Sequence, residues 1–134
     1  MIRTAQCCCG QASIELEGDP TIHAVCHCKD CKKRTGSAFG ISAYFSNSQV
    51  RRKIGGVQIY EINNEETRQK RYFCSFCGTT LYWEMSHFPR IPGVTEMTGV
   101  ASGCFVDEPL PNPVFSANNE DRCVWLELPT LKIV

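Results

Sequence analysis

Seven of the ten cysteines in this chain could bind a metal, because they fall into three short clusters. These clusters are the first pair, the triad and the last pair: Cys7-x-Cys9, Cys26-x-Cys28-x-x-Cys31 and Cys74-x-x-Cys77. Zinc takes four ligands in closed structural sites, whereas catalytic sites hold it with three protein ligands and keep a fourth position free. Seven spaced cysteines therefore indicate one closed site and one open site, where water or a substrate would bind.

The cysteines are expected to be reduced rather than joined in disulfides. The N-terminal residues lack the apolar run of a signal peptide, and no stretch approaches the roughly 18 apolar residues that span a bilayer. These features predict a cytoplasmic protein, and in a reducing compartment such spacings favour metal binding. A redox Cys-x-x-Cys normally opens a helix after a strand, whereas the last pair lies between two strand-like segments.

The spacing leaves open which cysteines share an ion. The two Cys-x-x-Cys knuckles, one inside the triad and one formed by the last pair, could together hold a single structural zinc. Alternatively, the first pair joins the last pair, and the triad is left as an open three-thiolate site. Spacing alone favours the first grouping. In a Cys-x-Cys pair on a strand both sulfurs lie on one side, so Cys8 and His27 are expected to point away from the metal.

The elements that must position these cysteines read as short strands with little helix. Apolar–polar alternation and β-rich composition predict strands at Ser13–Glu17, Phe39–Ser46, Val57–Ile59, Arg68–Phe73, Leu81–Trp83 and Val124–Leu128. Lys29–Thr35 is predicted to form a helical turn that Gly36 ends. Gly55-Gly56 and Asn63-Asn64 are predicted turns, the first closing a hairpin. The sequence therefore predicts a mainly β fold.

Composition and charge narrow the functional class. The 134 residues suit a single domain, residues 1–134, that buries roughly 68% of the surface exposed by its unfolded chain. Fourteen basic and fourteen acidic side chains give a formal net charge of zero, which argues against a nucleic-acid or membrane-surface partner. No paired carboxylates, nucleophile–base–acid set or phosphate-binding glycine loop is recognisable. The cysteines therefore carry the expected chemistry.

Four longer strings contain the cysteine clusters and their neighbours. They are Cys7-Cys8-Cys9-Gly10, Cys26-His27-Cys28-Lys29-Asp30-Cys31, Thr35-Gly36-Ser37-Ala38-Phe39-Gly40 and Phe73-Cys74-Ser75-Phe76-Cys77-Gly78-Thr79-Thr80-Leu81. Together with Arg122-Cys123-Val124-Trp125, they resemble the family of the glutathione-dependent formaldehyde-activating enzyme and centromere protein V. The resemblance runs nearly end to end and implies a β-tent of small antiparallel sheets pinned by zinc.

The resemblance also implies a role for each cluster. It places the first and last pairs in a structural zinc site: Cys7, Cys9, Cys74 and Cys77. It places the triad in a catalytic zinc site, open to a small-molecule thiol such as glutathione: Cys26, Cys28 and Cys31. The implied activity is that of a carbon–sulfur lyase acting on a thiol adduct, for which S-hydroxymethylglutathione is the family's example.

An open three-thiolate zinc site suits a thiol ligand better than hydrolysis. Coordination deprotonates a thiol whose free pKa is about 8.5, and three thiolates make the metal a weak Lewis acid. The resulting thiolate could add to an aldehyde carbon, or a carbon–sulfur adduct could collapse in reverse. The alternative function is a non-catalytic, zinc-stabilised binding module.

Basic residues near the triad are candidates for receiving the carboxylates of glutathione, or else form a solvated turn. They are Lys29, Lys32, Lys33 and Arg34. Two other basic stretches, Arg51–Lys53 and Lys70-Arg71, are predicted to be solvated.

Several positions leave the substrate and the second site open. Ser116 stands where family members often carry histidine, and Phe88–Thr98 has no recognisable signature. Cys123 is predicted to be a small buried residue in a strand. Alternatively, either Cys104 or Cys123 could supply a fourth ligand and close the triad site.

Overall fold

The computed structural model describes residues 1–128 and 131–134, which are mainly β as the sequence predicts. The strands are β1 (Ile2–Gln6), β2 (Ser13–Glu17), β3 (Ile22–Cys26), β4 (Gly40–Ser46), β5 (Val50–Ile54), β6 (Val57–Asn63), β7 (Arg68–Cys74), β8 (Thr80–His87), β9 (Met97–Ala101), β10 (Phe115–Ala117) and β11 (Lys132–Ile133). The helices are α1 (Lys29–Thr35) and the 3-10 turns η1 (Asn47–Gln49), η2 (Val94–Glu96), η3 (Ser102–Cys104) and η4 (Asn119–Asp121). No helix in the described ranges is long and apolar enough to cross a membrane.

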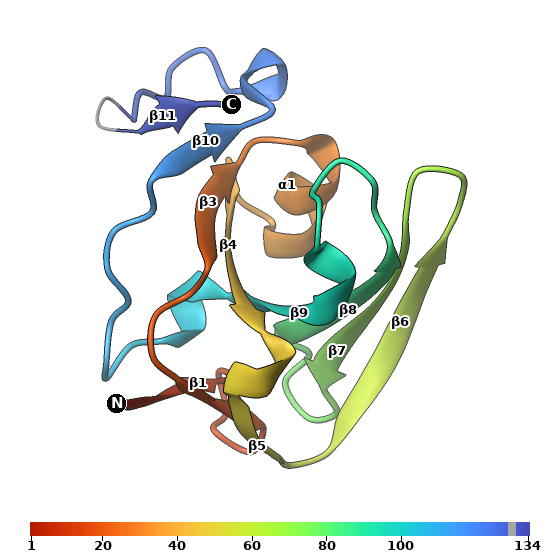
Figure 1. Cartoon of the computed structure of the whole chain (residues 1–134), viewed down its shortest axis with the longest axis vertical. Coiled ribbons are helices and arrows are strands. Elements are labelled where there is room, and N and C mark those ends of the chain that lie inside the picture. Colours follow the sequence, from red (N-terminus) through yellow and green to blue (C-terminus); the bar gives the residue numbers. More distant parts are fainter. Residues whose placement is uncertain (129–130) are drawn as a thin grey trace.

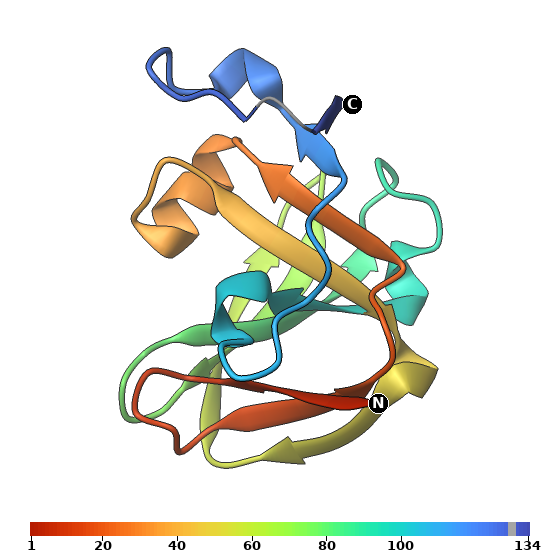
Figure 2. The same ribbon diagram turned by 90° about the vertical axis from the view of Figure 1, so that its left-hand side faces the viewer.

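The strands form two sheets (Figures 1 and 2). The smaller sheet has the order β1-β2-β5, and the larger has the order β11-β10-β3-β4-β9-β8-β7-β6. Most neighbours are antiparallel, whereas β10 runs parallel to both β3 and β11. Strand β3 therefore lies between β4 and β10, and α1 follows directly from the end of β3.

The main core lies between the two sheets. Ile14 and Leu16 of β2 are fully buried and share one apolar cluster with Phe45, Leu81 and Val100 of the larger sheet. A second cluster contains Tyr44 and Trp83 and covers the other face of the larger sheet. Strand β4 thus contributes to both clusters, which explains why four successive residues, 42–45, are buried.

The two predicted turns have different outcomes. Asn63-Asn64 closes the β6–β7 hairpin, where the Asn64 N–H donates to the Thr67 carbonyl at 2.9 Å. The prediction that Gly55-Gly56 closes a hairpin is wrong, because β5 pairs with β2 and β6 pairs with β7. This turn carries the chain from one sheet to the other. Gly55 has φ +90°, and a Cβ there would lie 2.0 Å from the Gln11 carbonyl oxygen, so only glycine fits.

The predicted strand at Val124–Leu128 is wrong. Val124 is 95% exposed and Trp125 is 75% exposed, and the Leu126 N–H donates to the Cys123 carbonyl at 3.0 Å in a turn. β-Branched and aromatic residues favour strands because they fit a half-buried pleated surface, and no such surface covers this segment. The other predicted strands are present, and the predicted helical turn is α1, which ends at Gly36 with φ 64°.

Candidate metal centre

The first and last cysteine pairs come together in one group, although Cys9 and Cys74 are 65 residues apart in the chain. The sulfurs of this four-cysteine group all lie within 4.8 Å of one another: Cys7, Cys9, Cys74 and Cys77. The Cys7 and Cys9 sulfurs are 3.6 Å apart, and those of Cys9 and Cys74 are 3.7 Å apart. Sulfurs around a tetrahedral zinc with bonds of about 2.3 Å lie about 3.8 Å apart, so the group is compatible with zinc.

Two tight turns bring these sulfurs together. After β1, the Gly10 N–H donates to the Cys7 carbonyl at 3.1 Å, and after β7, the Gly78 N–H donates to the Cys74 carbonyl at 3.0 Å. The expectation that Cys7 and Cys9 face one side of a strand is therefore wrong, because a turn holds both of them. The grouping that spacing favours is also not found, since the two Cys-x-x-Cys knuckles belong to separate groups.

Hydrogen bonds to sulfur favour the charged form of some thiols in the four-cysteine group, whereas at Cys9 a backbone hydrogen bond from Gln11 lowers the pKa but burial and the neighbouring thiols raise it to about 12. The Ala12 N–H donates to Cys7 Sγ at 3.2 Å, and the Phe76 N–H donates to Cys74 Sγ at 3.4 Å. A hydrogen bond with the Thr79 hydroxyl is the main cause that lowers the pKa of Cys77 to about 5. Such bonds stabilise the charged form of a thiol, which is the form that binds a metal.

The triad forms the second group, at the junction of β3 and α1. Cys26 ends β3, Cys28 is the N-cap of α1, and Cys31 lies within α1. The Cys31 N–H donates to Cys28 Sγ at 3.3 Å, so the capping bond of the helix also fixes this sulfur. The three sulfurs lie within 4.8 Å of one another. Among the described residues, no fourth histidine, cysteine or carboxylate joins them at that distance.

The three triad sulfurs shift one another's pKa values. Hydrogen bonds with the Cys28 and Cys31 side chains lower the pKa of Cys26. Hydrogen bonds with Cys26 and Cys28 raise the pKa of Cys31. Three thiolates at this spacing repel one another, and a bound divalent ion would offset that repulsion. The donor set therefore fits a soft, thiolate-binding metal such as zinc.

Two arginines secure α1 against the larger sheet. Arg71 of β7 is buried and forms an ion pair with Asp30, between Cys28 and Cys31. Arg34 places its guanidinium carbon 4.5 Å from the centre of the Trp83 ring. The prediction that Arg71 is solvated is wrong, because α1 folds over this part of β7 and provides it with a carboxylate.

Asn118, beyond β10, also contacts the triad. Its Nδ2 donates to Cys26 Sγ at 3.1 Å, and its Oδ1 accepts from Arg90 Nη2 at 2.8 Å. Sequence reasoning missed both residues, and Arg90 belongs to the Phe88–Thr98 segment that showed no signature. The pairing of β10 beside β3 brings Asn118 to Cys26, and only the tertiary structure shows that pairing.

His27 does not join the triad sulfurs, as expected. Its ring is fully buried, and its Nε2 lies 3.0 Å from the hydroxyl of Ser116. That hydroxyl donates its single hydrogen to Asn119 Oδ1 at 3.0 Å, so His27 Nε2 must be the donor to Ser116. Ser116, which stands at the position where the resemblance led us to look for histidine, is therefore a buried partner of His27.

A cavity of about 370 Å³ lies between the flanks of the two cysteine groups. Its lining comes from the residues after the triad, from those after the last pair and from η3: Arg34, Thr35, Phe39, Ile41, Gly78, Thr79, Thr80, Ala101, Ser102, Gly103 and Cys104. Small-molecule sites have volumes of roughly 300–1,000 Å³. Of the basic residues near the triad, Lys32 is already bonded to the Asp121 carbonyl, whereas Arg34 lines this cavity.

The three remaining cysteines stay outside both groups. Cys104 lines the cavity, and burial is the main cause that raises its pKa to about 11. Cys123 is only partly buried and lies outside any strand, so its predicted place in a buried strand is wrong. Cys8 is exposed, and its backbone N–H donates to the Thr79 hydroxyl at 3.1 Å.

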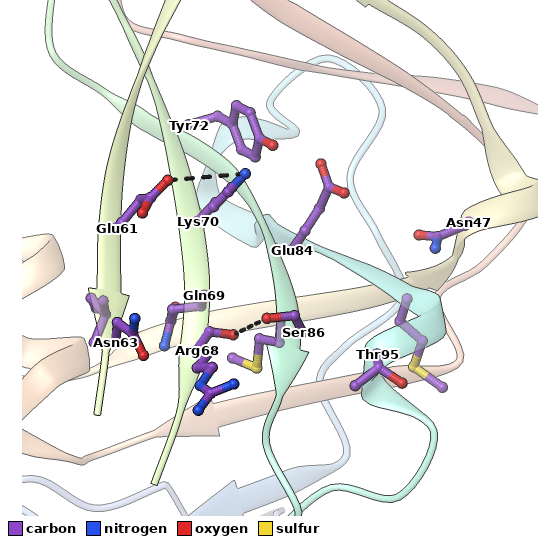
Figure 3. Close-up of a pocket in the computed structure, with 13 residues that line it drawn as sticks. Asn47, Glu61, Asn63, Arg68, Gln69, Lys70, Tyr72, Glu84, Ser86 and Thr95 are labelled. Carbon is purple, nitrogen blue, oxygen red and sulfur yellow. Dashed lines mark hydrogen bonds and ion pairs between the residues drawn. The ribbon is translucent and has the colours of Figure 1, made fainter. Parts of the chain in front are cut away.

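A groove on β6, β7 and β8, also of about 370 Å³, lies at the ends of β7 and β8 farthest from the last pair. Figure 3 shows Glu61, Lys70, Tyr72 and Glu84 among its residues, with Lys70 paired to Glu61 at 3.9 Å. No cysteine lines it. Its mixed charges indicate no single class of ligand, so the cysteine groups remain the candidate site.

Comparisons with known proteins agree with this fold. No curated protein matches the chain. Among solved structures, the fold is similar to a protein from Rhodobacter sphaeroides, with a TM-score of 0.56 and 22% sequence identity over 81% of this chain and 91% of that one. The family model described as glutathione-dependent formaldehyde-activating enzyme matches residues 2–119, so the chain belongs to that family.

Proposed function

We propose that this protein is a zinc-dependent carbon–sulfur lyase that forms or cleaves the adduct of a small thiol and an aldehyde, such as S-hydroxymethylglutathione. The observation that carries the proposal is the triad, in which three sulfurs lie within 4.8 Å and no fourth side chain among the described residues completes the group. Three protein ligands leave one position for a substrate. Family membership supports glutathione as the thiol.

The proposal gives the two cysteine groups different roles. The four-cysteine group, Cys7, Cys9, Cys74 and Cys77, would hold a structural ion. The triad, Cys26, Cys28 and Cys31, would hold the catalytic ion. A zinc ion held by the triad would supply a site for the substrate sulfur as a thiolate at neutral pH.

The reaction needs a sulfur nucleophile and a place for the rest of the thiol. In the forming direction, the thiolate sulfur donates an electron pair to the aldehyde carbon, the carbonyl π electrons move to oxygen, and this oxygen takes a proton from solvent. Cleavage reverses each of these steps. The protein's residues orient the thiol, and the cavity beside Arg34 is large enough for a small peptide thiol. The exposed Lys33 and the Arg34 guanidinium offer charge for its carboxylates.

Metal content and thiol binding test the proposal together. The purified protein should hold two zinc ions per chain, and Cys31→Ser should hold one and lose glutathione binding measured by calorimetry. Cys123→Ser, which alters a cysteine outside both groups, is the matched control and should behave like the wild type. Formation of the adduct from glutathione and formaldehyde, followed by NMR, should depend on Cys31.

A fully zinc-loaded protein that neither binds a small thiol nor turns over any thiol adduct would overturn this function. That result would favour a non-catalytic, zinc-stabilised binding module instead. A single zinc per chain that Cys31→Ser retains would show that the triad does not bind the metal.

A further inference from the structure

The side-chain amide of Asn118 is fixed at both ends. Its oxygen accepts from Arg90 Nη2 at 2.8 Å, and its nitrogen donates to Cys26 Sγ at 3.1 Å. An arginine can only donate hydrogen bonds, so the amide oxygen must face Arg90 and the N–H must face the sulfur. The arginine thus sets the orientation that makes the amide a donor to Cys26.

The backbone of Asn118 is held in an uncommon conformation. It has φ 56° and ψ 47°, and it is the only non-glycine residue with positive φ in the part of the chain that the structure describes. The left-handed region costs conformational free energy for residues other than glycine, although asparagine tolerates it better than most. Glycine would serve the turn without that cost. Strained positions of this kind cluster at functional sites, which directs attention to the Asn118 amide.

The negative charge at a metal-loaded triad gives the Asn118 amide a role. Three thiolates and a divalent ion carry a net charge of −1, and a substrate thiolate in the fourth position would make it −2. Backbone and side-chain N–H groups are the donors that can offset this excess without displacing a ligand. Such donors include the Cys31 N–H on Cys28 Sγ and the Asn118 amide on Cys26 Sγ.

We propose that Asn118 is a positioning residue for the triad, whose N–H···S hydrogen bond keeps Cys26 on the metal while a substrate thiol occupies the fourth position. Arg90 acts one step further out, by holding the amide in its donating orientation. The proposal rests on the proposed function, because it requires a metal ion at the triad.

Cobalt substitution tests this role without relying on turnover. Cobalt(II) bound to thiolates absorbs through sulfur-to-metal charge transfer, so loss of the second equivalent to a chelator can be followed directly. Asn118→Gly removes the hydrogen bond and relieves the backbone strain. The variant should bind the second cobalt about 10–100-fold more weakly, the usual effect of losing an outer-shell partner. Its charge-transfer band should shift, and its thermal stability should be equal to or higher than that of the wild type.

Matched variants separate this effect from general damage. Asn112→Gly makes the same change in an exposed loop and should leave cobalt binding unchanged. Arg90→Ala should weaken binding of the second cobalt by less than Asn118→Gly does, because the Asn118 amide remains but is free to rotate. Arg52→Ala, which removes another exposed arginine, should have no effect on it.

The possible results separate the positioning role of Asn118 from the proposed function. If Asn118→Gly holds the second cobalt as tightly as the wild type, with the same spectrum, the positioning role is overturned and the proposed function stands. A variant that loses thermal stability but keeps its cobalt affinity would likewise show a merely structural role. If the wild type binds a single cobalt that Cys26→Ser does not disturb, both proposals fall.

Discussion

The two cysteine groups use the same short motifs but connect different lengths of chain. The four-cysteine group joins the turn after β1, in the smaller sheet, to the turn after β7, in the larger one. The triad draws all its sulfurs from residues 26–31, at one strand end and one helix start. A long-range group cross-links the fold, whereas a local group can change without separating the sheets. The proposed function accordingly assigns architecture to the long-range group and chemistry to the local one.

Burial also differs between the two groups. Cys7 and Cys74 are 4% and 1% exposed and belong to the main core cluster, whereas Cys9 and Cys77 are exposed, so the four-cysteine group extends from the core to the surface. All three triad cysteines are half-buried, and α1, which contains Cys31 and is capped by Cys28, has no fully buried residue. The triad therefore depends on a few specific contacts for its shape.

The largest contrast is expected between Cys74→Ser and Cys31→Ser. A structural zinc contributes about 10–16 kcal/mol of apparent binding energy, which is comparable to or larger than the usual net stability of a domain, about 5–15 kcal/mol. Cys74→Ser should therefore lose cooperative thermal unfolding measured by circular dichroism, while Cys31→Ser keeps it. Equal thermal stability of the two variants would remove the architectural distinction between the groups.

Much of this division could be predicted from the sequence. The Cys-x-x-Cys spacings, the helical turn at Lys29–Thr35 and five of the eleven described strands could be read from local patterns. The grouping of the cysteines could not be predicted from spacing, because it depends on which turns meet across two sheets. In this case the family resemblance, rather than spacing, pointed to the observed grouping.

The contacts around the triad were beyond sequence reasoning for the same reason. Arg71 reads as a solvated charge until α1 places Asp30 over it. Asn118 reaches Cys26 because β10 runs parallel to β3, and Arg90 in turn contacts Asn118. The strand predicted at Val124–Leu128 is absent for a related reason. The residues favour a strand, but no neighbouring surface buries them.

Asp30→Asn should weaken metal binding at the triad and leave metal binding at the four-cysteine group unchanged. The variant leaves Arg71, a buried side chain, facing a neutral amide in place of a carboxylate, and a hydrogen bond to a charged group contributes about 1–1.5 kcal/mol more than one to a neutral group. Denaturant unfolding should show a loss in that range, and a chelator should remove metal from the triad faster than from the four-cysteine group. Asp107→Asn, at an exposed position, is the control. Equally accelerated loss from both groups would mean that α1 and the long-range group are coupled.

Gly36→Ala should have a smaller effect at the same helix. Gly36 ends α1 with φ 64°, and a Cβ there would meet no atom within 4 Å, so only backbone strain opposes the change. We expect a loss of about 1 kcal/mol in the free energy of unfolding. Gly103→Ala also meets no atom within 4 Å but lacks the positive φ, and it should be nearly neutral. If the two variants are equally stable, the left-handed end of α1 is not what shapes the triad.

The smallest effect is expected at His23, which belongs to neither group. Burial lowers its pKa below 6.5, so the folded state binds fewer protons than the unfolded state at mildly acidic pH. Its contribution to stability is therefore complete above pH 6.5 and is lost as the pH falls from there through the folded-state pKa. Between pH 7.5 and 5.5, the wild type should lose more stability in urea unfolding than His23→Gln does.

Protonation of the metal-binding thiols also reduces stability at low pH, but it acts on both proteins and cancels in the difference between them. His87→Gln, at the exposed end of β8, makes the same change without burial and should follow the wild type. Parallel stability curves for the wild type and His23→Gln would contradict the assignment. They would also mean that the acid sensitivity of this fold arises from the cysteine groups rather than from its sheets.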